Sequence, residues 1–354
     1  MARYRERLER DLDGWIASSL VLAQNRAAIL ASVGEARRLD ASTALAVVGA
    51  MLAGVAAIAL VAANWSDIPR VARFALILVV FLWAAGGAAW AHSRGRPLAS
   101  QTLLCVAALV FAAAIGLTGQ IFDIAGDLQA ALRGAGVAAL LLAVAGRSSW
   151  AAAVGLVFLV LGDLARTPFL DDASAWPGWI AVVAPIGAGI ALWRTSKVLA
   201  HVAGVGCVVA VLTFDRVFAG QADVVFLTAA MVLAAAACGA RMLQARAERP
   251  AGVLYGWFAA GALLWFGVSG GAADTLGGVA HSVAWLALSV AVLALGRHDR
   301  HTAVTAEGVI SLIAAGAFLL FNLGVGLLSS AAVFGGAAVV ALVVAFVMRR
   351  AVRS

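Results

Sequence analysis

Two short polar segments of the sequence carry side chains that could bind a ligand. The first runs from residue 63 to 69 with the sequence ANWSDIP, and the second from residue 119 to 127 with the sequence GQIFDIAGD. Side-chain amides accept and donate hydrogen bonds, and carboxylates accept them or coordinate hard cations. If the two segments meet in space, they predict a polar binding site formed by Asn64, Trp65, Asp67, Gln120, Asp123 and Asp127.

Arg133 is the natural counter-charge for this cluster, because it follows Asp127 closely in the sequence. An arginine inside a hydrocarbon layer costs roughly 2.5 to 3.5 kcal/mol on insertion scales, so it requires a partner. Asp127 and Asp163 are the two candidates. Arg133 therefore belongs to the predicted ligand-binding set.

A purely structural interpretation accounts for the same residues. Trp65 fits the aromatic belt of a membrane interface, and Pro69 fits the first turn of a helix. Asn64 and Asp67 are good helix caps, and the second segment could do no more than close a turn. Both interpretations stay open at this point.

Nothing else in the sequence indicates catalysis, a cofactor or a metal site. It has no HExxH motif, no repeated Glu-x-x-His and no carboxylate pair deep in an apolar run, which disfavours metalloprotease, di-iron and proton-relay chemistry. The three cysteines, Cys105, Cys207 and Cys238, lie within apolar runs, where a thiol behaves as a small hydrophobe.

Four further polar residues lie in apolar runs. His201, His281 and Asn322 stand alone there, and a hydrogen-bonded role in helix contact is the simplest interpretation. Glu307 lies about one turn from the end of its run, from where we expect it to snorkel to the surface.

The elements that position these residues must be membrane-spanning helices. The 354 residues are 64% hydrophobic with a mean hydropathy of +1.01, far above the roughly 45 to 50% apolar content of soluble domains. The net charge of +7 does not indicate nucleic-acid binding, since the Lys and Arg residues are scattered between apolar runs. We therefore predict an all-α polytopic bundle in contact with the lipid bilayer.

Charged clusters divide the chain into twelve apolar runs of about the length that crosses a bilayer. Two very short connections, near residues 147 and 195, predict tight hairpins whose arms could be re-entrant, so ten spans is the alternative. The runs are approximately 43–63, 71–91, 99–118, 128–145, 149–165, 177–193, 197–214, 222–241, 251–269, 276–296, 303–323 and 328–348.

The distribution of basic residues predicts the topology. Cytoplasmic connections carry an excess of Lys and Arg. With the N-terminus inside, 20 of the 25 Lys and Arg residues lie on the cytoplasmic side, and the outer side receives only Arg70, Arg73, Arg133, Arg166 and Arg216. We therefore expect both termini in the cytoplasm, and the protein in the cytoplasmic (inner) membrane of a bacterium.

Residues 1–42 precede the first apolar run and have the pattern of an amphipathic helical hairpin. Tyr4, Leu8, Leu12 and Trp15 recur at helical spacing, Ser18 and Ser19 can break the chain, and Ile29, Leu30 and Val33 provide a second apolar stripe. The hairpin either lies against the membrane or docks a cytoplasmic protein partner.

The two polar segments, together with this N-terminal hairpin, resemble a bacterial family of predicted membrane proteins known as domain of unknown function 2157. The family has an A-N-W-x-x-I-P turn and a G-Q-I-[YF] turn, and both occur here at the expected separation. The resemblance covers roughly residues 3–150 and implies a cytoplasmic hairpin followed by four spans. It implies no activity, because the family has none assigned.

These observations predict three parts: the hairpin at 1–42, a four-span bundle at 43–148, and a further bundle of about eight spans at 149–354. They leave three classes of function. The first is a non-enzymatic scaffold, sensor or regulator of the envelope, and the second is a transporter of a small solute or lipid with an entry site in the outer polar segments. The third is an envelope-lipid enzyme using outer carboxylates such as Asp123 and Asp127, or Asp171 and Asp172, which rarely have the shifted pKa such work needs.

Overall fold

The computed structural model describes residues 2–32, 68–122, 126–165, 178–218, 221–244, 249–270 and 275–324. Within these ranges the chain contains twelve α-helices, one short 3₁₀ helix and no strand. It forms two compact units, Met1–Pro69 and Arg70–Ser354. The first and last predicted runs, 43–63 and 328–348, lie outside the described residues.

The N-terminal unit contains the predicted amphipathic hairpin. Helix α1 (Ala2–Ala17) ends just before the two serines, and Ser19 has a positive φ of 58°. The 3₁₀ helix η1 (Ala23–Asn25) leads into α2 (Arg26–Ser32). Leu12 and Leu30 are buried, and Arg26 donates to Asp13 Oδ1 at 2.9 Å, so the short helices are joined by an apolar contact and an ion pair.

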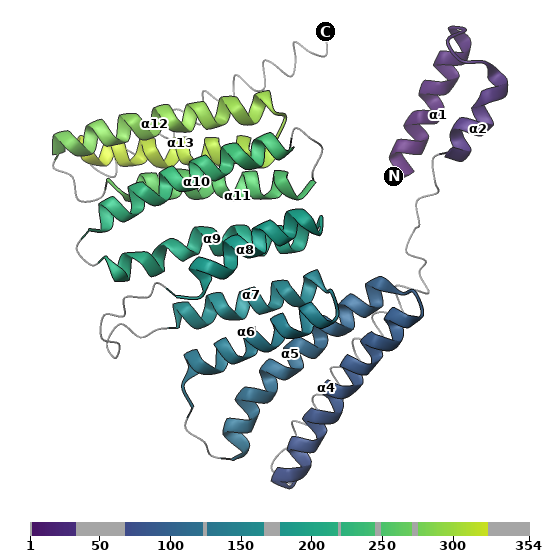
Figure 1. Ribbon diagram of the computed structural model, residues 1–354. Coiled ribbons are helices and arrows are strands. Elements are labelled where there is room, and N and C mark those ends of the chain that lie inside the picture. Colours follow the sequence, from purple (N-terminus) through teal and green to yellow (C-terminus); the bar gives the residue numbers. More distant parts are fainter. Residues whose placement is uncertain are drawn as a thin grey trace. The chain divides into compact units, whose positions relative to one another are not determined.

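The larger unit is an array of helical hairpins stacked side by side (Figure 1). Each even-numbered helix packs most closely on the odd-numbered helix that follows it, and the odd-numbered helices form a continuous row through the array. The helices are α4 (Arg70–Ser93), α5 (Pro97–Ile121), α6 (Leu128–Ala145), α7 (Ser149–Leu164), α8 (Ile180–Trp193), α9 (Lys197–Val217), α10 (Ala222–Gln244), α11 (Arg249–Val268), α12 (Thr275–His298) and α13 (Thr302–Asn322).

Four of the hairpins turn by the same local mechanism. Gly95, Arg147, Thr195 and Arg300 each have a φ between 48° and 67°. The N–H of the next residue then bonds to the carbonyl five residues earlier, as from Ser148 to Ala143 at 2.9 Å. This is the Schellman termination of a helix. In three of the turns the same next residue, a Ser or His, caps the following helix, which confirms tight hairpins near residues 147 and 195.

Small residues allow the helices to approach closely. A Cβ built on Gly136 of α6 would lie 3.0 Å from the carbonyl oxygen of Gly155 on α7, and one on Gly308 of α13 would lie 2.7 Å from the backbone nitrogen of Leu293 on α12. Neither position accepts a larger residue without moving a helix. Packing therefore rests on close backbone contact, as expected where lipid competes for apolar side chains.

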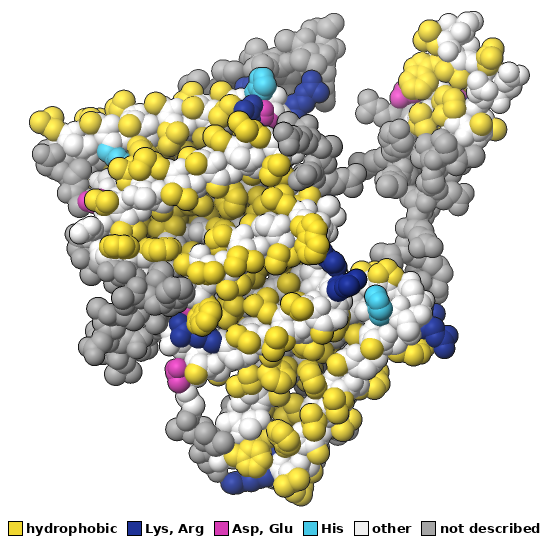
Figure 2. Space-filling model, in the orientation of Figure 1, with side chains coloured by type: hydrophobic (Ala, Val, Ile, Leu, Met, Phe, Trp, Pro, Cys, Tyr) yellow, Lys and Arg dark blue, Asp and Glu magenta, His cyan; other side chains and the backbone are white. Residues whose placement is uncertain are grey.

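Ten of the twelve predicted apolar runs each form one helix. Eight of the described helices are long and apolar enough to cross a membrane, whereas α7 and α8 have 16 and 14 residues. Hydrophobic side chains cover much of the face of the array drawn in Figure 2. Among the exposed hydrophobic residues of the array, Trp83, Val144 and Trp193 are at least 73% exposed. Such a surface requires lipid around it, so the protein is an integral membrane protein. The count of twelve spans stays a prediction.

Candidate functional site

The structure describes only part of the predicted polar site. Asn64, Trp65, Asp67 and Asp123 lie outside the described residues, and Gln120 is described only as a backbone position in the last turn of α5. Asp127 is the N-cap of α6, where its two carboxylate oxygens accept from the N–H groups of Gln129 and Ala130 at 3.1 and 3.0 Å. Ligand binding by this set stays a prediction, and the described geometry gives Asp127 a structural role.

Arg133 is paired with Asp163, one of its two predicted partners. The Arg133 Nη2 and Nε atoms donate to Asp163 Oδ1 at 2.7 and 3.1 Å, and the side chain of Asp163 is only 1% exposed. The other carboxylate oxygen, Oδ2, accepts from the Ile180 N–H at 2.8 Å. One carboxylate at the end of α7 therefore joins α6 to the first turn of α8.

The chain leading into α8 is shaped to fit this carboxylate. Gly178 has a φ of 114°, and a Cβ at this position would lie 2.7 Å from Asp163 Oδ2. Only glycine accepts both the backbone conformation and the close contact without strain. Since both carboxylate oxygens of Asp163 are engaged, the Arg133 pair stabilises the bundle.

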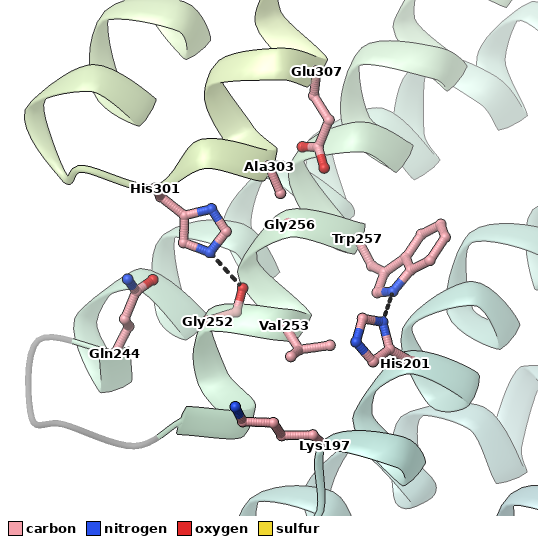
Figure 3. Close-up of a pocket in the computed structure, with 10 residues that line it drawn as sticks. All are labelled: Lys197, His201, Gln244, Gly252, Val253, Gly256, Trp257, His301, Ala303 and Glu307. Carbon is pink, nitrogen blue, oxygen red and sulfur yellow. Dashed lines mark hydrogen bonds between the residues drawn. The ribbon is translucent and has the colours of Figure 1, made fainter. Parts of the chain in front are cut away.

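A polar cavity of about 600 Å³ lies at the other end of the array, between α9, α10, α11 and α13 (Figure 3). It is formed by the first two turns of α9, α11 and α13 and by the last residue of α10. Five polar side chains line it: Lys197, His201, Gln244, His301 and Glu307. Four of these side chains are ionisable, and the cavity is our candidate functional site.

Two buried oxygen atoms in this cavity have no hydrogen-bond partner among the described residues. They are Oε2 of Glu307 and Oε1 of Gln244. Both side chains face α11, where Cβ atoms on Gly252 and Gly256, one turn apart, would lie 3.5 Å from Gln244 Cδ and from Glu307 Oε1. The expectation that Glu307 snorkels is thus wrong, since its Oε2 is buried and its Oε1 faces Gly256.

Hydrogen-bond donors line the opposite side of the cavity. Trp257 Nε1 donates to His201 Nδ1 at 3.0 Å, so in the neutral ring the proton of His201 is on Nε2. Lys197 precedes His201 by one helical turn, is exposed, and forms no ion pair with any described residue. Figure 3 shows Lys197 and Glu307 on opposite sides of the cavity, with Trp257 and His201 between them.

His301 holds the rim of the cavity in place. Its Nδ1 accepts from the Val304 N–H at 3.3 Å, which caps α13, and its Nε2 lies 2.9 Å from the carbonyl oxygen of Gly252 on α11. The neutral ring with its proton on Nε2 satisfies both bonds. Since both ring nitrogens are used, His301 positions α11 and α13, leaving the other four polar side chains to contact a ligand.

A second ion pair supports the same end of the bundle. Arg241 of α10 donates through two nitrogens to Asp299, just after α12, with Nη2 to Oδ1 at 2.8 Å. Tyr255 donates to the same carboxylate at 3.3 Å. The hydrogen bonds from the Arg241 guanidinium hold the pKa of Asp299 well below its ordinary value. This cluster fixes the turn that carries His301.

A second cavity, of about 740 Å³, is almost entirely apolar. It lies between α8, α9, α10 and α11, where Pro185 interrupts α8, and its few polar side chains include Gln221 and Thr228. No described group of three or more His, Cys, Asp or Glu residues is placed to hold a metal ion. The first cavity differs from this one in the ammonium, imidazole, amide and carboxyl groups that line it.

The array and its polar cavity define the class: a helical integral membrane protein with a solute-sized site inside its bundle. Residues 13–152 match the sequence model of a family described as predicted membrane protein (DUF2157), which confirms the resemblance seen in the two polar segments. No curated protein and no solved structure matches the chain. The polar cavity lies entirely outside the matched segment, in residues 197–307.

The association of the cavity residues was not predicted from the sequence, because each of them stands alone in its apolar run. The helix contact expected for His201 is confirmed by the bond to Trp257. The one expected for Asn322 is confirmed by its Nδ2, which donates to the Gly278 carbonyl and to Ser282 Oγ. His281 stacks on Phe266, and its Nε2 has no partner among the described residues. The one available signal was the Gly252-x-x-x-Gly256 spacing facing an acidic residue in a neighbouring span.

Proposed function

We propose that the protein is a non-enzymatic membrane protein that binds a small solute carrying an amino group in the cavity between α9, α10, α11 and α13. The observation that carries this proposal is the pair of buried, unpartnered oxygens on Glu307 and Gln244. An acceptor buried without a partner costs about 1 to 3 kcal/mol, and more if it is charged. A bound ammonium group can supply the missing donor to Glu307 Oε2.

The aromatic wall of the cavity supports the same ligand class. Trp257 lines the cavity between the acceptors and His201 (Figure 3), and the face of a Trp ring attracts cations. Its indole is held by the bond to His201, and Gly204 makes room for it, since a Cβ there would lie 2.8 Å from Trp257 Cβ. A carboxylate, an amide oxygen and an oriented indole together favour an organic cation.

We propose that this cavity lies at the cytoplasmic face of a bacterial inner membrane. In support, the cavity shares its end of the array with Arg94, Arg147, Arg194 and Arg300, and basic residues accumulate on the cytoplasmic side. The protein would thus sense or take up its ligand from the cytoplasm. A docking role for residues 1–42 would couple that binding to a protein partner.

Binding is tested by the thermal stability of the purified protein in detergent with and without ethanolamine. A ligand that binds only the folded state at a hundred times its Kd stabilises by about 2.7 kcal/mol. We expect ethanolamine to raise the Tm of the wild type and to leave Glu307→Gln unchanged. Asp223→Asn is the matched control, because it makes the same change in an exposed residue at the opposite end of α10. Equal shifts in wild type and Glu307→Gln would overturn the proposal.

A further inference from the structure

We infer that the ligand of this cavity is a zwitterion, whose acidic group is bound by Lys197 and His201 while its amino group is bound by Glu307. The inference rests on the proposed function and adds a second subsite to it. It starts from the positions of Lys197 and Glu307 on opposite sides of the cavity (Figure 3).

The donor side has the features of an anion site. Lys197 and His201 are four residues apart on α9, so both project from one face of the helix. Lys197 is the first residue of α9, where the helix dipole favours negative charge. The bond from Trp257 to His201 Nδ1 leaves the Nε2 proton as the donor available to a ligand. A carboxylate or phosphate would receive hydrogen bonds from both side chains.

The two charged ends of the cavity do not neutralise each other directly. Neither Lys197 nor Glu307 forms an ion pair with any described residue, although both line the same space. An intervening molecule with an ammonium at one end and an acidic group at the other would satisfy both. A free amino acid has this pattern, and so does the phosphoethanolamine headgroup of a membrane lipid.

The decisive comparison is between ligands that carry one charge and ligands that carry both. Ethanolamine, inorganic phosphate, glycine and phosphoethanolamine are titrated separately into the detergent-solubilised full-length protein by calorimetry. A hydrogen-bonded charge contributes enough to change affinity by roughly tenfold to a hundredfold. We therefore expect glycine or phosphoethanolamine to bind tighter than ethanolamine by that factor.

Variants separate the two subsites. Lys197→Gln should lose the preference for the zwitterion over ethanolamine, whereas Glu307→Gln should lose both ligands. Arg297→Gln is the control, because it removes an exposed positive charge from the same end of the bundle without lining the cavity. Lys197 is itself exposed, so its replacement leaves the packing intact.

The outcomes distinguish this inference from the proposed function. If ethanolamine binds the wild type and neither zwitterion binds tighter, or if Lys197→Gln keeps the preference, the anion subsite is refuted and amine binding stands. If ethanolamine fails to bind, the proposed function is refuted. Whether the ligand is a lipid headgroup or a free solute is tested in nanodiscs, where each lipid competes with phosphoethanolamine for binding. If phosphatidylethanolamine competes and phosphatidylglycerol does not, the ligand is a lipid. If neither lipid competes, the ligand is a free solute.

Discussion

Replacing Asp163 should destabilise the protein more than any other single removal of a carboxylate among the described residues. Its side chain is 1% exposed, and it accepts from Arg133 of α6 and from the Ile180 N–H of α8. Breaking a buried pair by removing one partner typically costs 3 to 5 kcal/mol, because the other charge stays buried. Arg133 keeps 23% of its side-chain exposure, so we expect about 3 kcal/mol for Asp163→Ala.

Asp163→Asn tests the contribution of charge to this loss of stability, because it keeps the shape of the side chain and removes its charge. Arg133 and the Ile180 N–H donate to different oxygens of the carboxylate, and an amide replaces one of these oxygens with an NH₂ group. One of the two donors would face the amide NH₂ group, and we expect a loss of about 1 to 3 kcal/mol. The double variant Arg133→Met with Asp163→Leu removes both charges, so it should be more stable than Asp163→Ala although the Ile180 N–H loses its acceptor.

The assay is reversible unfolding of the purified protein in mixed micelles with increasing dodecyl sulfate, followed by circular dichroism and Trp fluorescence. Asp223→Ala is the control, because Asp223 is exposed in the first turn of α10. The reasoning would be refuted if Asp163→Ala and Asp223→Ala lost the same stability. It would also fail if the effects of Arg133→Met and Asp163→Leu simply added, since residues in direct contact should couple.

Three further predictions concern the other end of the bundle and its orientation. The lowered pKa of Asp299 means that its ion pair stabilises the fold at neutral pH. This stability begins to decrease as the pH falls below the ordinary value of 3.8 and is lost as the pH falls through the lowered pKa; the Tm should therefore drop on acidification, and less so in Arg241→Gln. Cysteines introduced at Asp171 and Arg94 in a cysteine-free background should react with an impermeant reagent from outside at 171 only. Gly256→Leu should abolish ethanolamine binding by filling the cavity beside Glu307.

Each of these predictions has its own control or contradicting result. An identical acid dependence in Arg241→Gln would exclude the Asp299 pair as its source. Labelling at Arg94 and not at Asp171 would reverse the topology. Gly239→Leu is the control for the cavity, because a Cβ at Gly239 meets nothing within 4 Å. If Gly256→Leu still binds ethanolamine, the ligand binds at a different place in the protein.

Helix positions could be predicted from the sequence because each depends on a contiguous stretch of chain. A spanning segment must satisfy its own backbone hydrogen bonds in lipid, so a long apolar run has only the helix available to it. The hairpin turns at Arg147 and Thr195 are equally local, since each is fixed by a few neighbouring residues. The ends of α8 show the limit: it begins at Ile180 rather than at residue 177.

From the sequence, the ion-pair partner of Arg133 could be narrowed to two carboxylates, but the choice between them could not be made. Charge in an apolar run demands an acceptor, and the sequence offered Asp127 near in the chain and Asp163 farther away. Asp127 accepts hydrogen bonds from the N–H groups of its own helix, whereas Asp163 lies beside Arg133 because α6 and α7 pack closely through Gly136 and Gly155. The packing of these two helices therefore determines which carboxylate pairs with Arg133.

By itself, therefore, the sequence determined the class of protein, the positions of its described helices, the family resemblance of its first part and the need of Arg133 for a partner. Only the tertiary structure decided where a ligand could bind. Lys197, Gln244 and Glu307 come from three helices spread over more than a hundred residues, and each has an ordinary interpretation alone. They become a site because stacking of the hairpins brings three helix ends together over the glycine face of α11, an arrangement that no local pattern specifies.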